Sequence, residues 1–200
     1  MTFSNQRQAQ HDIDTIFLDR WSPRGFDSSI MPDEDLLKLF EAARWAPSGS
    51  NQQPWNFVYA KRESADWPVF LDCLMDGNKR WVETTSVLMF VISRKFGLSS
   101  SGQRRPHGSH SFDTGAAWMA LALQARELGY YTHGMGGIYK DKIAELLELN
   151  TDDYAIEAAI AVGKRAPIET LPADIAEREV PSQRKPITDF VFAGKFEPKM

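Results

Sequence analysis

The sequence has little cysteine and no long apolar run. One cysteine in 200 residues, Cys73, cannot build an internal disulfide framework. The longest apolar run, SVLMFVI around Val87 to Ile92, is far shorter than the roughly 20 residues that cross a bilayer. The first residues, MTFSNQRQAQ, lack the basic and then apolar pattern of a signal peptide. These absences predict a cytoplasmic protein without a membrane span.

The sequence also has no excess of positively charged residues. The formal charge of -4 gives no basic field for phosphate backbones, so a general role in nucleic-acid binding lacks electrostatic support. A hydrophobic content of 42% is enough for one core, and no internal repeat is visible, so we expect a single domain over residues 1–200. The 6 tryptophans and 12 phenylalanines suit a thick core or a flat ligand equally well. Small-molecule chemistry is the favoured class of function.

Familiar nucleotide and metal motifs are also missing. The segment Gly134 to Gly137 is rich in glycine, but it fits neither GxGxxG nor a Walker pattern. His107 and His110 could be half of a metal site, yet no second pair of matching spacing accompanies them. We therefore expect no metal and a solvated loop there. Cys73 lies on an apolar stretch and is expected to be a packed thiol.

Apolar spacing at helical intervals predicts five helices, over residues 12–18, 32–45, 64–75, 112–128 and 140–149. Pro32 and the three acids after it mark a helix start. Pro47 and the loop formers that follow end that helix, so APSGSNQQPW, from Ala46 to Trp55, is predicted to be a loop. The helix over 112–128 is apolar on most sides, which predicts burial in a core or against a partner subunit.

Strands are predicted over residues 55–60, 86–93, 130–132 and 155–162. Residues 98–110 are polar and are expected to form a mobile loop, in which Arg104 and Arg105 either meet the phosphate of NADPH or are merely solvated. Residues 133–139 are expected to be a glycine loop. The order of elements predicts a mixed α/β or α+β sandwich. Residues 165–200 hold five prolines among charges, a composition that needs support from elsewhere.

Three short segments could bind a ligand. Arg20 to Arg24 offers guanidinium and hydroxyl donors that suit phosphate, although a solvated loop would look the same. Pro47 to Gln53 offers neutral donors and acceptors that suit the edge of a flat heterocycle, or a plain polar turn. Gly134 to Gly137 would allow a backbone to approach a ligand closely, or would simply form a turn. Each segment by itself leaves both interpretations open.

The order and spacing of these segments resemble the FMN-dependent nitroreductase-like oxidoreductases. The matching pattern runs from about Ile13 to Val191 and comprises RWSPRGF, APSGSNQQPW, an Asn78-x-x-Trp81-Val82 segment, DTGAAWMALALQARELG, MGGI and a late Arg184-Lys185-Pro186. The resemblance implies an α+β fold with a central, mostly antiparallel sheet flanked by helices. It also implies a homodimer with FMN sites at the interface, in which an arm over residues 165–200 wraps the partner.

The resemblance implies a role for each matching residue. Arg20, Ser22 and Arg184 would hold the FMN phosphate, and Arg24 would lie near flavin N1 and O2. The loop over residues 47–53 would reach a flavin bound mainly by the other subunit, while Asn78 and the MGGI loop would lie at the pyrimidine edge and at N5. Trp21 and Gly49 depart from the family's usual residues, so their contacts would come from the backbone. The expected cofactor-binding residues are Arg20, Trp21, Ser22, Arg24, Pro47, Ser48, Gly49, Asn51, Gln53, Asn78, Met135, Gly136, Gly137 and Arg184.

The function that the resemblance implies is a ping-pong cycle. NAD(P)H reduces FMN and leaves, and a small electron acceptor such as a nitroaromatic, a quinone or an activated alkene takes its place. The flavin carries the hydride chemistry, so no catalytic side chain is expected. One alternative is a flavin-binding sensor or carrier with little turnover. Another is a structural domain whose loop motifs are coincidental.

Overall fold

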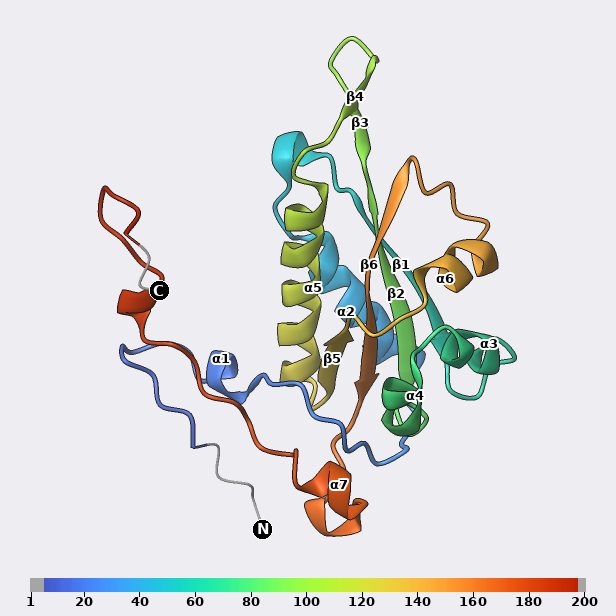
Figure 1. Ribbon diagram of the computed structural model, residues 1–200, viewed down its shortest axis with the longest axis vertical. Coiled ribbons are helices and arrows are strands. Elements are labelled where there is room, and N and C mark those ends of the chain that lie inside the picture. The colour runs from blue at the N-terminus through green and yellow to red at the C-terminus, as the bar shows by residue number, and fades with distance from the viewer. Residues whose placement is uncertain (1–5, 198–200) are drawn as a thin grey trace.

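A computed structural model describes residues 6–197 and has a four-stranded antiparallel sheet at its centre (Figure 1). The strand order is β1-β2-β6-β5. The strands are β1 (Trp55–Lys61), β2 (Val87–Arg94), β5 (Tyr131–Met135) and β6 (Tyr154–Gly163). The two central strands are the most apolar, as expected for strands covered on both faces. The expected α+β fold with a central antiparallel sheet is confirmed.

Helices cover both faces of the sheet, and β2 shows how the sequence divides its side chains between them. Leu88 and Phe90 point to a core formed with α3 (Trp67–Asp72), α4 (Asp76–Val82) and α6 (Lys140–Leu146). Val87, Met89 and Val91 point to a second core formed with α2 (Asp33–Arg44) and α5 (His110–Glu127). This alternation follows from the two-residue period of a strand. No helix within residues 6–197 is long and apolar enough to cross a membrane.

The long helix α5 is buried on one side only. Ala117, Leu121 and Ala125 are fully buried against α2 and the sheet. On the other side, the side chains of Phe112 and Met119 are 82% and 38% exposed. The alanines allow the close packing of α5 on α2, and the exposed apolar residues leave a face that the single chain does not cover.

Several predicted boundaries are wrong. Residues 98–110 are not a featureless loop, because β4 (Arg104–Pro106) pairs with β3 (Phe96–Leu98) in a hairpin. Strand β5 continues through Gly134 to Met135, where the absence of a Cβ lets the Trp118 ring pack on the strand. The helix expected over 64–75 is only α3, and the glycine and asparagine expected to end it lie inside α4. The helix expected over 12–18 is reduced to α1 (Ile16–Asp19).

Beyond β6 the chain leaves the sheet and runs beside the N-terminal segment (Figure 1). It contains α7 (Ala173–Ala176) and the short 3₁₀ turns η2 (Ile168–Thr170) and η3 (Ile187–Asp189). The Arg7 guanidinium donates to the Ser182 carbonyl at 2.9 Å, and the Ile187 amide donates to Gln10 Oε1 at 3.0 Å. The C-terminal residues therefore depend on the N-terminal segment for support. Their exchange with a partner subunit stays a prediction.

Candidate functional site

The arginines of the RWSPRGF segment and of the C-terminal arm meet at one small cavity. Its volume is about 250 Å³, and its walls are mostly polar. Five of the expected residues line it: Arg20, Trp21, Ser22 and Arg24 from the RWSPRGF segment, and Arg184 from the arm. The structure therefore brings together residues more than 160 positions apart in the sequence, as the phosphate-binding prediction requires. The cavity can accept an anion with several oxygen atoms.

The electrostatics of this cavity favour a bound anion. Burial and the neighbouring Arg184 lower the pKa of Arg20 below its usual value. Burial and Arg178 likewise lower the pKa of Arg24, although Glu179 opposes that shift. Like charges held together at a partly buried place repel one another, and a phosphate among them removes that cost. The cavity is therefore suited in size and charge to the phosphate group of a nucleotide such as FMN.

Two further arginines of the cavity were missed in the sequence. Arg7 comes from the N-terminal segment, and Arg178 follows α7. Neither belongs to a recognisable motif, and both sit in segments whose position depends on long-range contacts. Only the packing of the arm against the N-terminal segment reveals them.

Trp21 contributes packing to this region. Its ring is 6% exposed and meets the Tyr131 ring edge-on at 6.2 Å. The Arg165 guanidinium lies over the Trp21 ring, with Cζ 5.2 Å from the ring centroid. The indole thus anchors the RWSPRGF segment to β5, which fixes where the arginines on either side can point.

A second group of expected residues lies at the end of β5. Asn78, on α4, donates its side-chain amide to the Gly137 carbonyl at 2.9 Å. Gly137 also has no room for a side chain, because an added Cβ would lie 2.6 Å from Asn78 Nδ2. Gly136 is open, with no atom near its missing Cβ, while the Met135 side chain is buried. Gly136 thus leaves its backbone uncovered, and Asn78 fixes the position of the adjoining Gly137 carbonyl.

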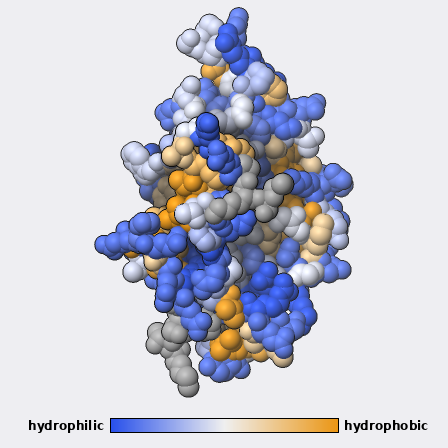
Figure 2. Space-filling model, turned by 60° about the vertical axis from the view of Figure 1, so that its left-hand side comes forward, coloured by the Kyte–Doolittle hydropathy of each residue, from blue (hydrophilic) through white to orange (hydrophobic). Residues whose placement is uncertain are grey.

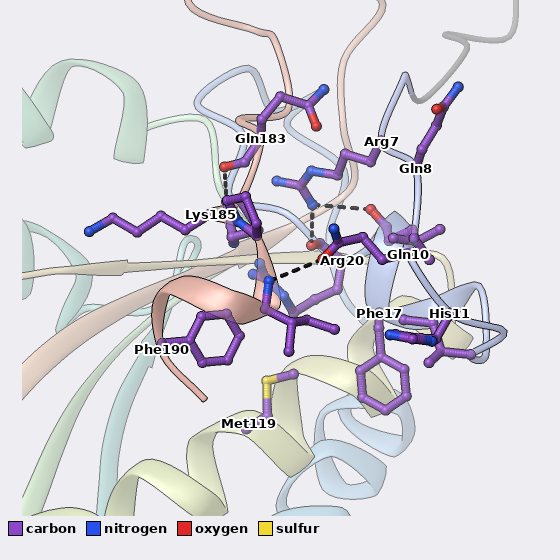
Figure 3. A pocket seen from close by; sticks show the side chains of 16 residues that line it. Arg7, Gln8, Gln10, His11, Phe17, Arg20, Met119, Gln183, Lys185 and Phe190 are labelled. Atoms are coloured by element: carbon purple, nitrogen blue, oxygen red, sulfur yellow. Dashed lines mark hydrogen bonds between the residues drawn. The ribbon is translucent and has the colours of Figure 1, made fainter. Parts of the chain in front are cut away.

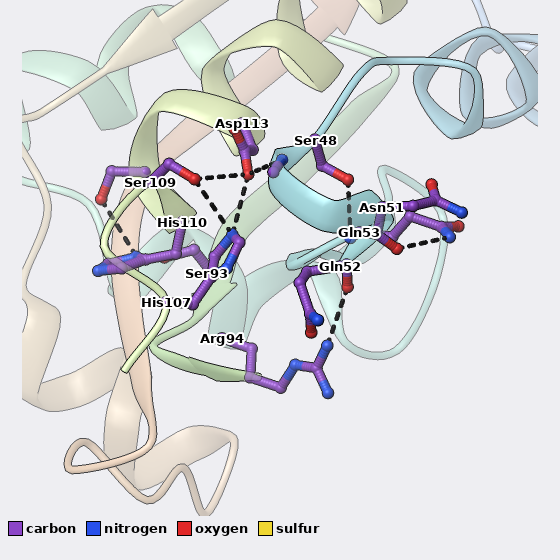
Figure 4. A network of polar contacts seen from close by, with 12 residues as sticks. Ser48, Asn51, Gln52, Gln53, Ser93, Arg94, His107, Ser109, His110 and Asp113 are labelled. Carbon is purple, nitrogen blue, oxygen red and sulfur yellow. Dashed lines mark hydrogen bonds and ion pairs between the residues drawn. The ribbon is translucent and has the colours of Figure 1, made fainter. Parts of the chain in front are cut away.

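The polar loop over residues 47–53 has an unusual conformation. Ser50, Asn51 and Gln53 have φ values of 50°, 53° and 47°, in the left-handed region that non-glycine residues seldom adopt. The Ser48 hydroxyl accepts a hydrogen bond from the Gln53 amide at 3.0 Å. The loop is therefore tightly curled, with the Asn51 and Gln53 side chains on its exposed rim (Figure 4).

This loop and the arginine cavity lie at opposite ends of the sheet. The Gln52 carbonyl accepts a hydrogen bond from Arg94, which pairs with Tyr154 at the start of β6. Pro23, beside the cavity, is bonded to His133, which pairs with Ala161 near the end of β6. Seven residues of an extended strand span roughly 23 Å. The structure thus does not bring the two expected halves of the site together within one chain.

The histidines of the 98–110 segment are not simply solvated. The His107 side chain is 9% exposed, and its Nε2 lies 2.9 Å from Asp113 Oδ2. His110 Nδ1 lies 2.7 Å from the Ser93 hydroxyl. The expected solvated loop is wrong here because His110, the first residue of α5, bonds to Ser93 of β2, and His107, just before the helix, bonds to Asp113 in its first turn. Cys73 is buried at 3% exposure, and burial raises its pKa, which confirms a packed thiol.

Comparison with known proteins identifies the family of the chain. The sequence model described as "Nitroreductase family" matches residues 18–80 and 73–164. A solved structure described as an oxidoreductase containing FMN is 54% identical, covers 100% of both chains and superposes with a TM-score of 0.93. "Putative NAD(P)H nitroreductase YdgI" of Bacillus subtilis is 25% identical over 189 residues, 78% of this chain and 90% of that protein. "CLA biosynthesis enone reductase" of Lactiplantibacillus plantarum is also 25% identical over 189 residues, 78% of this chain and 87% of that protein.

The family match spans most of the described chain, and it includes the RWSPRGF segment, the polar loop, α5 and the MGGI segment. The structural match extends over the whole length at more than half identity. The chain belongs to the nitroreductase family.

Proposed function

We propose that this protein is a homodimeric FMN-dependent oxidoreductase that takes electrons from NAD(P)H and passes them to a small acceptor in a ping-pong cycle. The observation that carries the proposal is the placement of an arginine-lined cavity and a polar loop at opposite ends of one sheet. Two copies can supply the two halves of a complete site, whereas one copy cannot. The names of the relatives, a flavoprotein oxidoreductase, an NAD(P)H nitroreductase and an enone reductase, support the same chemistry.

FMN fits the chain's own residues. Arg20, Ser22 and Arg184 would hold its phosphate, whose charge relieves the repulsion among the arginines. Arg24, farther along the same segment, would lie near flavin N1 and O2. Nothing lies within 4 Å of the missing Cβ of Gly136, and a backbone N–H group of this segment would donate to flavin N5. FMN, when bound, supplies the hydride chemistry.

The protein's contribution is electrostatic and positional. A permanent cation at Arg24 stabilises negative charge at flavin N1 and so favours the reduced state. Asn78 fixes the carbonyl of Gly137 and with it the direction of the adjoining backbone. Nitroaromatics, quinones and activated alkenes are the acceptors we propose, because the named relatives include a nitroreductase and an enone reductase.

The homodimer is supported by an uncovered apolar surface. Ile13, Phe17, Met119 and Phe190 are all exposed by more than a third. Figure 2 shows apolar atoms on the face of the molecule that carries α1 and the C-terminal arm. The same face holds a groove of about 880 Å³ between α1, α5 and the arm (Figure 3). A surface of this kind is typical of a subunit interface.

Anaerobic stopped-flow mixing tests the reaction. The purified protein should be yellow and contain FMN. NADH or NADPH should bleach the flavin absorption, and a nitroaromatic, quinone or enone should restore it in a second mixing step. A yellow protein that neither nicotinamide reduces would instead be a flavin-binding sensor or carrier. A colourless protein that FMN does not reconstitute would contradict any flavin function.

Complementation between two damaged chains tests the shared site. One chain carries Arg20→Glu, which reverses a charge in the cavity. The other carries Asn51→Gly and Gln53→Gly, which remove side chains of the loop at positions where glycine tolerates the positive φ. Each homodimer should lose FMN, but a heterodimer should keep one intact site and bind one FMN per dimer. A heterodimer that binds none would show that each site is built within a single chain.

A further inference from the structure

Asp113, in the first turn of α5, accepts three hydrogen bonds although it is 4% exposed. The Gly49 amide donates to its Oδ2 at 3.0 Å, the Ser109 hydroxyl at 3.0 Å and His107 Nε2 at 2.9 Å. Burial opposes ionisation, but these three donors together lower the pKa of Asp113. The side chain is therefore a carboxylate, surrounded by donors from the loop and from the hairpin connection just before its helix (Figure 4).

The loop that Asp113 holds is the one with three left-handed residues. Such a conformation persists only where the surroundings determine it more strongly than the local preference of the chain. Gly49 is at the start of the 3₁₀ turn η1 (Gly49–Asn51), directly before Ser50, the first of those residues. The bond from the Gly49 amide to Asp113 therefore fixes the loop at the point where it curls.

The space beside Gly49 is also restricted. A Cβ added at Gly49 would lie 2.9 Å from Ser109 Oγ, 3.6 Å from His107 Cε1 and 3.7 Å from Asp113 Oδ2. The Ser109 hydroxyl alone is closer than ordinary van der Waals contact, so it is the atom that leaves no room for a side chain at Gly49. His107 is itself fixed by its backbone amide, which donates to the Lys95 carbonyl at 2.7 Å. The anchor is connected through the hairpin to the sheet.

We infer that Asp113, supported by His107, is a positioning residue that holds the 47–53 loop in the shape required to contact the flavin of the partner subunit. This inference rests on the proposed function, because the loop must reach a flavin for its shape to matter. Asp113 itself acts through the loop and does not touch the cofactor. The three hydrogen bonds converge on one oxygen, Oδ2, and an anionic acceptor makes each of them stronger than a neutral one would.

The test is Asp113→Asn in the FMN-bound dimer. An amide carries no negative charge, and its carbonyl oxygen accepts the three hydrogen bonds at Oδ2 more weakly than a carboxylate does, so we expect FMN binding to weaken about tenfold. The visible circular dichroism of the bound flavin should change with it. Glu157→Gln is the matched control, because Glu157 accepts from Ser93 and Ser111 at the same end of α5 without holding the loop. It should leave FMN affinity within about twofold of the starting protein.

Two further measurements distinguish a role of Asp113 in positioning the 47–53 loop from a role in the stability of the fold alone. In a heterodimer with an Arg20→Glu chain, the Asp113→Asn lesion should fall on the same site as Arg20→Glu and leave the second site at full affinity. If Asp113→Asn does not fold, Gly49→Ala takes its place, and adding Ser109→Ala should recover part of the lost affinity by removing the clashing oxygen.

The outcomes distinguish a failure of the proposed function from a failure of the role given to Asp113. A starting protein that binds no FMN contradicts the proposed function. A starting protein that binds FMN normally, with Asp113→Asn unchanged or with Glu157→Gln equally impaired, contradicts the role of Asp113 alone. Loss at both sites of the heterodimer, or no recovery by Ser109→Ala, does the same.

Discussion

His133 Nδ1 lies 2.7 Å from the carbonyl oxygen of Pro23, 110 residues earlier in the chain. A carbonyl only accepts, so His133 carries its proton on Nδ1 and donates it. The same imidazole ring packs on Trp81, with ring centroids 4.6 Å apart. This one side chain therefore ties the RWSPRGF segment to β5 and α4.

The protonation of His133 should make the protein sensitive to acid. Burial, together with Arg24 and Arg178, lowers its pKa to about 4, against the opposing bond to Pro23. The unfolded chain, with a histidine pKa near 6.5, then binds more protons at intermediate pH. The stabilisation from neutral His133 is complete above about pH 6.5 and is lost progressively as the pH falls from 6.5 to 4, by about 3 kcal/mol in all.

Urea unfolding at pH 7 and pH 4.5 measures this dependence for the protein and for His133→Gln. The difference in unfolding free energy between the protein and His133→Gln should be smaller at pH 4.5 than at pH 7. Replacement of the exposed His11 by Gln is the control and should leave the pH dependence unchanged. A His133 resonance that titrates near pH 6.5 in NMR would contradict the prediction.

Arg20→Gln should stabilise the FMN-free protein and weaken its binding of FMN. Burial and Arg184 lower the pKa of Arg20, so removing its charge relieves repulsion and should raise the unfolding midpoint of the FMN-free protein. The same change removes a charge-assisted bond to phosphate and should weaken FMN binding by roughly tenfold or more. Thermal melts and FMN titrations measure the two effects. A lower melting point without FMN would count against a strained cluster of arginines.

Arg24→Ala should alter the flavin's redox potential more than its retention. Loss of the cation near N1 destabilises the reduced flavin, and we expect a midpoint potential lower by about 30–60 mV. Spectroelectrochemical titration measures it. Arg80→Ala is the control, since Arg80 is an exposed partner of Asp174 on the surface. Equal potentials for the Arg24 variant and the starting protein would rule out the role given to Arg24.

Gly134→Ala should destabilise the fold, whereas Gly136→Ala should not. A Cβ at Gly134 would lie 2.7 Å from Trp118 Cζ2, so the indole must move, at a cost of about 1–3 kcal/mol. Gly136 has nothing within 4 Å of its missing Cβ. Thermal or urea unfolding compares the two variants. A second change, Trp118→Leu, should recover part of the loss at Gly134, and no recovery would indicate another cause.

Tyr130→Phe should weaken the contact between the end of α5 and α2. The buried Tyr130 hydroxyl donates to Asp35 Oδ2 at 3.0 Å, and burial together with this carboxylate raises the Tyr130 pKa to about 12. Loss of one hydrogen bond to a charged acceptor should cost about 1–2 kcal/mol of unfolding free energy. The exposed Tyr59→Phe should change it by less than about 0.5 kcal/mol.

Local patterns in the sequence predicted much of the scaffold. The apolar run in β2, the alanine-rich α5 and the proline and glycine breaks predicted most elements at about the right place, because each depends on nearby residues. Errors arose where a distant contact overrides the local pattern. Trp118 lets Gly134 remain in a strand, and the pairing of Phe96 with Pro106 turns a polar stretch into a hairpin.

The candidate site was likewise predictable from the sequence only in part. The sequence by itself determined which segments carry ligand-binding groups, because arginines, polar loop residues and glycines are recognisable by type and order. Only the tertiary structure decided that Arg7 and Arg178 join Arg20 at one cavity, and that the 47–53 loop stands at the far end of the sheet on an anchor at Asp113. Those relationships depend on how strands pair and how the two chain ends pack together, which no local pattern of residues specifies.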